Sequence, residues 1–218
     1  MDFSLETIVL WAVPVVFAIT LHEAAHGYVA KLFGDHTAEM LGRITLNPLK
    51  HVDPVGTILV PGMLLALAWV NKSPPFVFGW AKPVPVNFAN LRDPKRDMIW
   101  VAAAGPGSNF LQALLWAIGL AATAPSGPWP SAGLFEMADI GFKVNLVLMA
   151  LNLLPLPPLD GGRVLAGLLP HGASNALSRI EPYGFFIILV LLALGLLDDL
   201  MRPLIRVAAS VISRIIGL

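Results

Sequence analysis

The stretch "LETIVLWAVPVVFAITLHEAAHGYVAKLF", residues 5–33, decides the fold because most of its residues are apolar. About 20 apolar residues can cross a bilayer as a helix, so this stretch predicts a transmembrane helix. Pro14 is expected to kink it. Asp2 and Glu6 stand where a secretory signal carries positive charge, and no small-residue cleavage site follows. We therefore interpret the stretch as a retained helix rather than a cleaved signal.

The composition of the whole chain agrees with a membrane protein. The chain has 218 residues, of which 56% are hydrophobic and 13% are charged. A soluble domain carries about 25% charged residues, so lipid is the expected surrounding of this chain. Its length predicts one compact domain, residues 1–218. The net charge of +0 indicates no nucleic-acid partner, and the lack of cysteine excludes disulfides and thiolate metal sites.

Further apolar stretches extend the prediction to an all-α polytopic protein with about four full transmembrane helices. The three additional spans are predicted at residues 98–123, 134–154 and 183–197. In the tail, about residues 203–218, Arg206 and Arg214 alternate with isoleucine, valine and leucine. This pattern is typical of an amphipathic helix that lies in the membrane interface.

The distribution of positive charge orients the predicted spans. Lysines and arginines occur on both sides of the short apolar segment 55–70, whereas the loop 124–131 has none. Because positive loops favour the cytoplasm, both flanks of 55–70 are predicted to be cytoplasmic. We therefore expect a re-entrant, partly β-like region at about 55–87 that dips into the membrane and returns. A full crossing with an unusual charge bias stays open as the alternative.

Three ionisable side chains near the end of the first apolar run predict a metal site. His22 and His26 are four residues apart, so they share one face of a helix and can reach one ion. Glu23 lies beside them and can act as general base on a water molecule that zinc acidifies. Ionisable residues inside a membrane are usually functional. The alternative is a hydrogen-bonded histidine pair with a buried glutamate.

A catalytic zinc ion normally has three protein ligands, so a third must come from elsewhere in the chain. Asp160 is the favoured candidate, in "NLLPLPPLDGGR" at the end of the third span. The first and third spans are predicted to run in the same direction, which brings Asp160 to the depth of the histidines. The alternative for Asp160 is an ordinary turn residue before glycine. Three loop histidines are weaker candidates: His36, His51 and His171.

These motifs resemble the site-2 protease family of intramembrane zinc metalloproteases. The resemblance rests on "HEAAH" at 22–26, "NLLPLPPLDGG" at 152–162 and "AGPGSN" at 104–109. Residues 33–57 and "FGWAKPVPVN" at 78–87 look like the compact subgroup without PDZ or CBS modules. Together the similar segments extend over most of the chain.

The resemblance implies a role for each matching residue. His22, His26 and Asp160 would bind one Zn²⁺ ion, and Glu23 would be the catalytic acid and base. Asn152 would contact the substrate backbone or support a metal ligand, with a plain interhelical hydrogen bond as the alternative.

Asn109, at the end of "AGPGSN", is interpreted differently from the site residues. It lies among small residues that let helices approach closely, so it is expected to serve helix packing rather than chemistry.

The resemblance also implies a function, namely hydrolysis of peptide bonds in or near transmembrane segments of other proteins. Such a substrate must unwind, and it could then pair with an edge strand at 42–47 or 82–87. The resemblance implies a prokaryotic inner membrane, and the positive loops predict an active site toward the cytoplasm. The alternatives are a transporter or ion-binding protein that uses the buried cluster, and an inactive zinc-binding scaffold. No oligomeric state is indicated.

Overall fold

The computed structural model describes residues 5–72 and 79–217, and in these two ranges the chain forms helices and no strand. The all-α prediction is therefore confirmed. The helices are α1 (Leu5–Leu32), α2 (Thr37–Met40), α3 (Val60–Asn71), α4 (Pro94–Thr123), α5 (Ala132–Asn152), α6 (Asp160–Leu168), α7 (His171–Ser178), α8 (Glu181–Ala193) and α9 (Leu196–Ile216).

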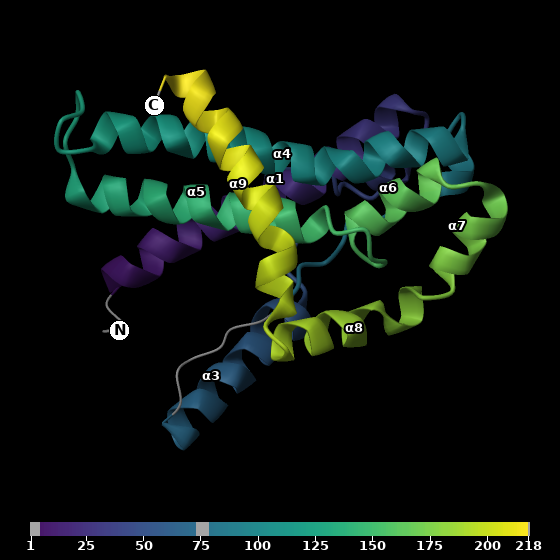
Figure 1. The fold of residues 1–218 in the computed structure, drawn as a ribbon, viewed down its shortest axis with the longest axis horizontal. Helices are drawn as coiled ribbons and strands as arrows, with labels where there is room; N and C mark the ends of the chain where they lie inside the picture. The colour runs from purple at the N-terminus through teal and green to yellow at the C-terminus, as the bar shows by residue number, and fades with distance from the viewer. Residues whose placement is uncertain (1–4, 73–78, 218) are drawn as a thin grey trace.

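The centre of the molecule is a bundle of α1, α4 and α5 (Figure 1). α4 and α5 form an antiparallel hairpin, and α1 runs in the same direction as α5. The predicted common direction of the first and third apolar segments is therefore correct. Small buried residues such as Ala113 and Ala117 of α4 face Leu146 and Ala150 of α5, which lets the two helices lie close together.

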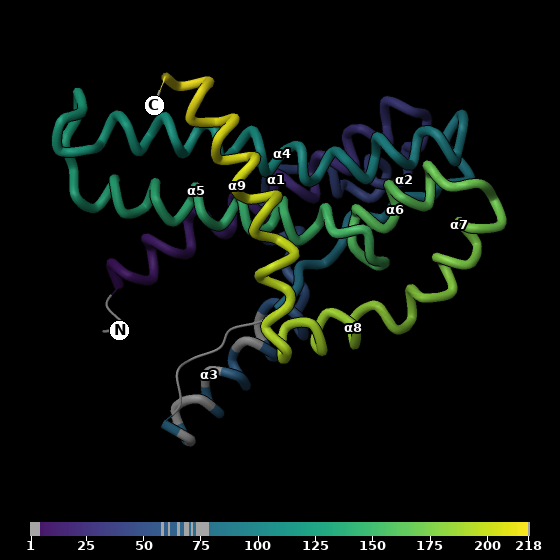
Figure 2. Tube along the Cα trace, in the orientation of Figure 1, coloured from purple at the N-terminus to yellow at the C-terminus, as the bar shows by residue number. Residues whose placement is uncertain are grey.

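The C-terminal helix α9 crosses α4 and α5 and completes this core (Figure 2). It buries Leu197, Met201, Ala208 and Ile212, which recur at helical spacing on one face. The predicted amphipathic tail is thus a helix, but it begins at Leu196 instead of 203, and much of its apolar face packs on protein. Each Å² of apolar surface that is buried contributes about 25 cal/mol to the free energy of folding, so this contact stabilises the fold.

Fewer helices than the sequence predicts are long enough and apolar enough to cross a membrane. Among the helices of residues 5–72 and 79–217, only α1 is long and apolar enough by itself. α7 and α8, bent by 63° relative to each other, would make a second span if the pair is one broken helix. α4 contains Pro106, Asn109 and Gln112, and these polar or helix-breaking residues lower its apolar character. The four predicted full spans are therefore not confirmed.

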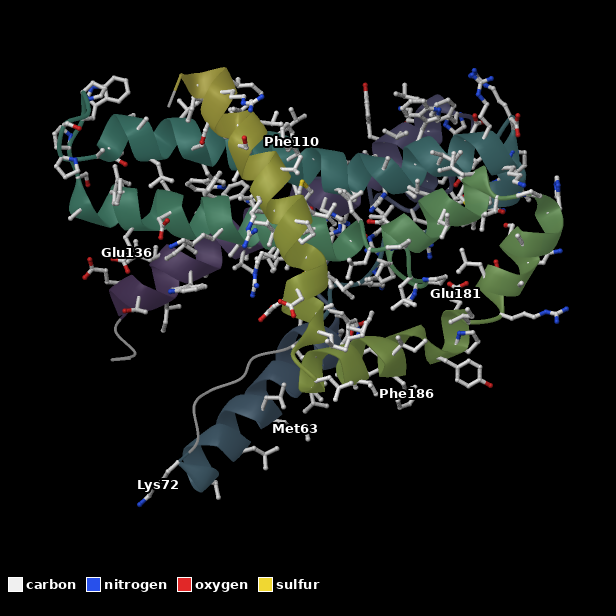
Figure 3. All side chains as sticks on the ribbon, viewed as in Figure 1. Met63, Lys72, Phe110, Glu136, Glu181 and Phe186 are labelled. Carbon is white, nitrogen blue, oxygen red and sulfur yellow. The ribbon has the colours of Figure 1, made fainter. Side chains whose placement is uncertain are left out.

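The predicted re-entrant region is more helical than its sequence suggests. A π-helix, η2 (Pro54–Leu59), leads directly into α3, and the change of helix type coincides with Pro61, which has no N–H. α3 projects from the bundle, and Figure 3 labels Met63 on α3 and Phe186 on α8, both exposed and away from the central bundle. Part of the predicted region, 73–78, lies outside the described residues.

The β-like character predicted for 55–87 and the short strand predicted at 42–47 are both wrong for the described residues. Residues 42–47 form a turn with Gly42 at φ +61°, followed by bends, instead of a strand. Residues 82–87 form neither a helix nor a strand. Pro83 and Pro85 remove two of the amide donors that a ladder needs, which is the physical reason for this difference.

Candidate metal centre

Two imidazoles from α1 form the first part of the site. His22 and His26 lie one helical turn apart, and their Nε2 atoms are 3.1 Å from each other. α4 passes closely over them at Gly105. A Cβ at this position would lie 2.6 Å from His22 Nε2 and would also collide with His26. Only glycine therefore fits where the two helices cross.

Asp160 enters the site from the start of α6. The chain turns sharply after α5, and a Cβ at Gly161 would collide with the carbonyl oxygens of Leu153 and Leu154. The glycine lets α6 fold back against the end of α5. Asp160 Oδ2 then lies 3.3 Å from His22 Nε2 and 3.3 Å from His26 Nε2.

The hydrogen bonds around the imidazoles indicate where their protons lie. His22 Nδ1 is 2.6 Å from Asn109 Oδ1, and His26 Nδ1 is 2.7 Å from the carbonyl oxygen of Val101. Both oxygens are acceptors, so each Nδ1 carries a proton, and in the neutral form of each ring Nε2 presents a lone pair. Asp160 Oδ2 is buried without a hydrogen-bond partner in the described part of the chain. Three electron-pair donors thus converge on one point, which a bound cation would stabilise.

The dimensions of this cluster fit zinc. One donor atom from each of His22, His26 and Asp160 lies within 4.8 Å of the others. A tetrahedral zinc site with bonds of about 2.0–2.1 Å has ligand atoms about 3.3–3.4 Å apart. The observed separations of 3.1, 3.3 and 3.3 Å therefore match one face of such a tetrahedron. The three residues also line a cavity of 160 Å³, into which a fourth position can open.

Asn109 supports this cluster, which corrects its interpretation as a packing residue. It is fully buried, and its amide group donates to the carbonyl oxygen of Ala18 and to Asn145 Oδ1. Asn145 in turn donates to the carbonyl oxygen of Gly141. These bonds fix the orientation of the Asn109 amide, so its oxygen must face His22. The spacing in the sequence could have indicated this position, since Asn109 lies one turn after Gly105 on the same face of α4.

We expect Asn109→Leu to weaken zinc binding by about 10–100-fold, the usual effect of losing an outer partner of a metal ligand. Leucine cannot accept the His22 proton, so the ring loses its fixed tautomer. Zinc affinity can be measured by competition with a chromogenic chelator. Gln112→Leu is the matched control, because Gln112 is a buried amide of the same helix without a bond to either histidine. Equal zinc affinity of Asn109→Leu and the control would contradict this role.

Glu23 lies in the same cavity and is held by the irregular segment 82–87. Its Oε2 accepts a hydrogen bond of 2.7 Å from the backbone N–H of Val84. Its Oε1 makes no hydrogen bond with residues 5–72 or 79–217. One carboxylate oxygen is thus anchored while the other remains available to a water molecule in the cavity.

Two buried charged residues hold the segment 82–87 in place. Arg43 Nη2 donates to the carbonyl oxygens of Lys82 and Pro83, at 2.8 and 3.3 Å. At the other end, Asp35 Oδ2 accepts from the N–H of Asn87 at 2.7 Å. Burial raises the pKa of Asp35, but hydrogen bonds from Thr37, Asn87 and Asn90 outweigh it, so the pKa is below its ordinary value. The sequence did not identify Asp35 or Arg43.

The remaining predicted site residues make no hydrogen bond to the cluster residues. Asn152 lines the cavity, but its amide group donates to the carbonyl oxygen of Leu148 on its own helix, not to a metal ligand. His36 pairs with Glu39 on the surface, and His51 Nε2 lies 3.1 Å from the carbonyl oxygen of Thr45. Neither they nor His171 belongs to a metal-binding cluster of the described residues.

Known proteins resemble this chain. The profile of the family described as Peptidase family M50 matches residues 122–195. "Putative zinc metalloprotease YwhC" of Bacillus subtilis is 40% identical over 202 residues, which cover 89% of this chain and 84% of that protein. "Putative zinc metalloprotease Rip2" of Mycolicibacterium smegmatis is 32% identical over 180 residues, covering 81% of this chain and 64% of that protein.

The protein of the same name from Mycobacterium tuberculosis H37Rv is 30% identical over 183 residues, covering 84% of this chain. The chain spans 64% and 65% of the two Rip2 proteins, which is slightly less than two thirds of their length. No solved structure matches it.

Proposed function

Because the chain belongs to Peptidase family M50, the site-2 protease family of zinc metalloproteases, we propose that it hydrolyses peptide bonds in or near transmembrane segments of other membrane proteins. The observation that carries this proposal is the convergence of His22, His26 and Asp160 beside Glu23 in one cavity. One Zn²⁺ ion would be held by the two imidazoles and the Asp160 carboxylate.

In the proposed reaction the zinc ion and the side chains of the protein have different roles. A bound zinc ion supplies Lewis-acid chemistry, which lowers the pKa of water and polarises a carbonyl group. Glu23 is the general base that removes a proton from the attacking water. It then transfers this proton to the leaving amine, so that the peptide bond breaks into a carboxylic acid and an amine. The Val84 N–H bond keeps Glu23 oriented during both transfers.

We further propose that the site lies within the membrane, near its cytoplasmic side, in a prokaryotic cell membrane. The apolar character of α1 and the membrane-embedded nature of the family support this setting. α4 and α5 have 30 and 21 residues, or about 45 and 31 Å, enough for a hydrocarbon core of about 30 Å. Their buried asparagines bond within the bundle, so lipid need not contact them.

The substrate is proposed to bind in an extended conformation along residues 84–86. A substrate helix must unwind locally, because its carbonyl groups are otherwise occupied by helical hydrogen bonds. Val84, which bonds Glu23 through its N–H, and Val86 both line the cavity. In extended backbone the N–H groups of residues two apart point to the same side, so the Val86 N–H is proposed to face the site as the Val84 N–H does.

Two other functions are less well supported. A transporter or ion-binding protein would use a buried polar path, whereas the described ionisable residues of the cluster meet at one point. An inactive zinc-binding scaffold would not need a base, yet Glu23 is present and oriented into the cavity.

Cleavage of a membrane-spanning substrate by the reconstituted protein tests the proposal. In zinc-containing liposomes we expect cleavage that stops when 1,10-phenanthroline removes the metal and returns when zinc is restored. A substrate with helix-breaking residues near the cleaved bond should react faster than one with a continuous leucine helix. Cleavage that is unaffected by the chelator, or no cleavage of any membrane-spanning substrate, would contradict the proposed function.

A further inference from the structure

Peptide hydrolysis places negative charge on the carbonyl oxygen of the bond being cleaved, and enzymes stabilise it with preorganised hydrogen-bond donors. The following inference rests on the proposed function. It concerns which hydrogen-bond donor of this chain, in addition to the metal ion, stabilises that oxygen. The candidates are the donors that line the 160 Å³ cavity.

Most of these donors are already occupied. The ring N–H groups of His22 and His26 bond to Asn109 and Val101. The backbone N–H of Val84 bonds to Glu23.

The side-chain amide of Asn152 is also committed, since it bonds to Leu148 in its own helix. The donors of the described lining that remain include the backbone N–H of Val86 and the guanidinium group of Arg163. Neither donates a hydrogen bond to residues 5–72 or 79–217. Arg163 is the one side chain of the described lining that is always positively charged.

Arg163 is suitably placed for this role. It follows Asp160 by three residues on α6, so both side chains lie on one face of the helix. Its guanidinium carbon lies 5.7 Å from the centre of the Phe88 ring, which also lines the cavity. A cation–π contact of this kind leaves the N–H groups of a guanidinium group available for hydrogen bonds. The described chain offers this edge no carboxylate, although such a partner is usual for a partly buried arginine.

We propose that Arg163 is a catalytic residue that donates a hydrogen bond to the carbonyl oxygen of the cleaved bond as negative charge develops there. It transfers no proton, because the guanidinium group stays protonated throughout. Glu23 performs the proton transfers, and Phe88 limits the positions that the guanidinium group can adopt. Val86 N–H then remains for the substrate backbone.

The test compares Arg163→Gln and Arg163→Lys with the control Arg179→Gln, which removes an exposed arginine outside the cavity. We expect Arg163→Gln to keep its zinc and to lose about 10²–10³-fold in kcat/KM, the usual effect of removing one such donor. Arg163→Lys should be intermediate. The control should equal the wild type.

A second readout separates a transition-state contact from a structural one. Binding of a phosphinic peptide, which carries negatively charged oxygens in place of the cleaved amide, should weaken in parallel with kcat/KM. Binding of the matching uncleaved peptide to a Glu23→Gln background should not change. In Arg163→Gly, millimolar guanidinium should restore part of the cleavage.

Several results would overturn the inference. These are unchanged kcat/KM in Arg163→Gln, equal weakening of the phosphinic and the uncleaved peptide, and loss of zinc in both Arg163→Gln and Arg163→Lys. Absence of cleavage by the wild type would instead count against the proposed function. The two failures are therefore distinguishable.

Discussion

Glu23→Gln is expected to keep its zinc and to cleave a membrane-spanning substrate about 10²–10⁴-fold more slowly than the wild type, the contribution of a positioned general base. Glutamine has the same shape, and its amide oxygen can still accept the hydrogen bond from Val84 N–H. It cannot remove a proton from water. Zinc content by atomic emission and cleavage in liposomes would be measured on the same preparation.

Glu39→Gln is the matched control for this experiment. Glu39 is an exposed carboxylate that pairs with Lys31 and His36, outside the cavity. The control should cleave at the wild-type rate. If Glu23→Gln also kept that rate, Glu23 would not be the base.

Asp160→Asn is expected to lose zinc, and with it cleavage. Asparagine replaces a carboxylate by a neutral amide, which is a poorer zinc ligand and leaves the cation without its nearest negative charge. We expect a loss of zinc affinity greater than the 10–100-fold that is typical of an outer partner such as Asn109. Dialysis against a zinc buffer followed by metal analysis would give the affinity.

Asp139→Asn controls for the loss of one acidic residue. Asp139 forms an ion pair with Lys143 on α5, away from the cavity, so its variant should retain zinc. Wild-type zinc affinity in Asp160→Asn would contradict the assignment of Asp160 as a ligand.

The sequence predicted the proximity of Asp160 and the histidines because two simple rules determine it. A spacing of four residues places His22 and His26 on one helix face. The charge distribution of the loops predicted that the first and third apolar segments run in the same direction, and α1 and α5 do so (Figure 1). The turn after α5 then brings Asp160, at the start of α6, to the two histidines of α1.

Other parts of the site depend on contacts between segments that are distant in sequence. Asn109 contacts His22 across 87 residues, and Val84 contacts Glu23 across 61. Composition around Asn109 favoured helix packing, because its neighbours are small. That interpretation holds for Gly105, where the helices cross. It did not include the hydrogen bond that Asn109, one turn further on the same face, makes to His22.

The predicted strands failed for a local reason. Alternation of polar and apolar residues in 42–47 and 82–87 is typical of strands, but a strand needs a partner with available donors and acceptors. Gly42 adopts a left-handed turn, and the prolines of 82–87 leave few donors. Individual bonds to Glu23, Arg43 and Asp35 hold the second segment in place of a ladder.

The most direct measurement of the metal site is an anomalous difference map of the zinc-loaded protein, collected on both sides of the zinc absorption edge. We predict one peak about 2.0–2.2 Å from Nε2 of His22, Nε2 of His26 and a carboxylate oxygen of Asp160. A peak whose ligands exclude Asp160, or a zinc-dependent protease whose only peak lies elsewhere, would contradict the assignment.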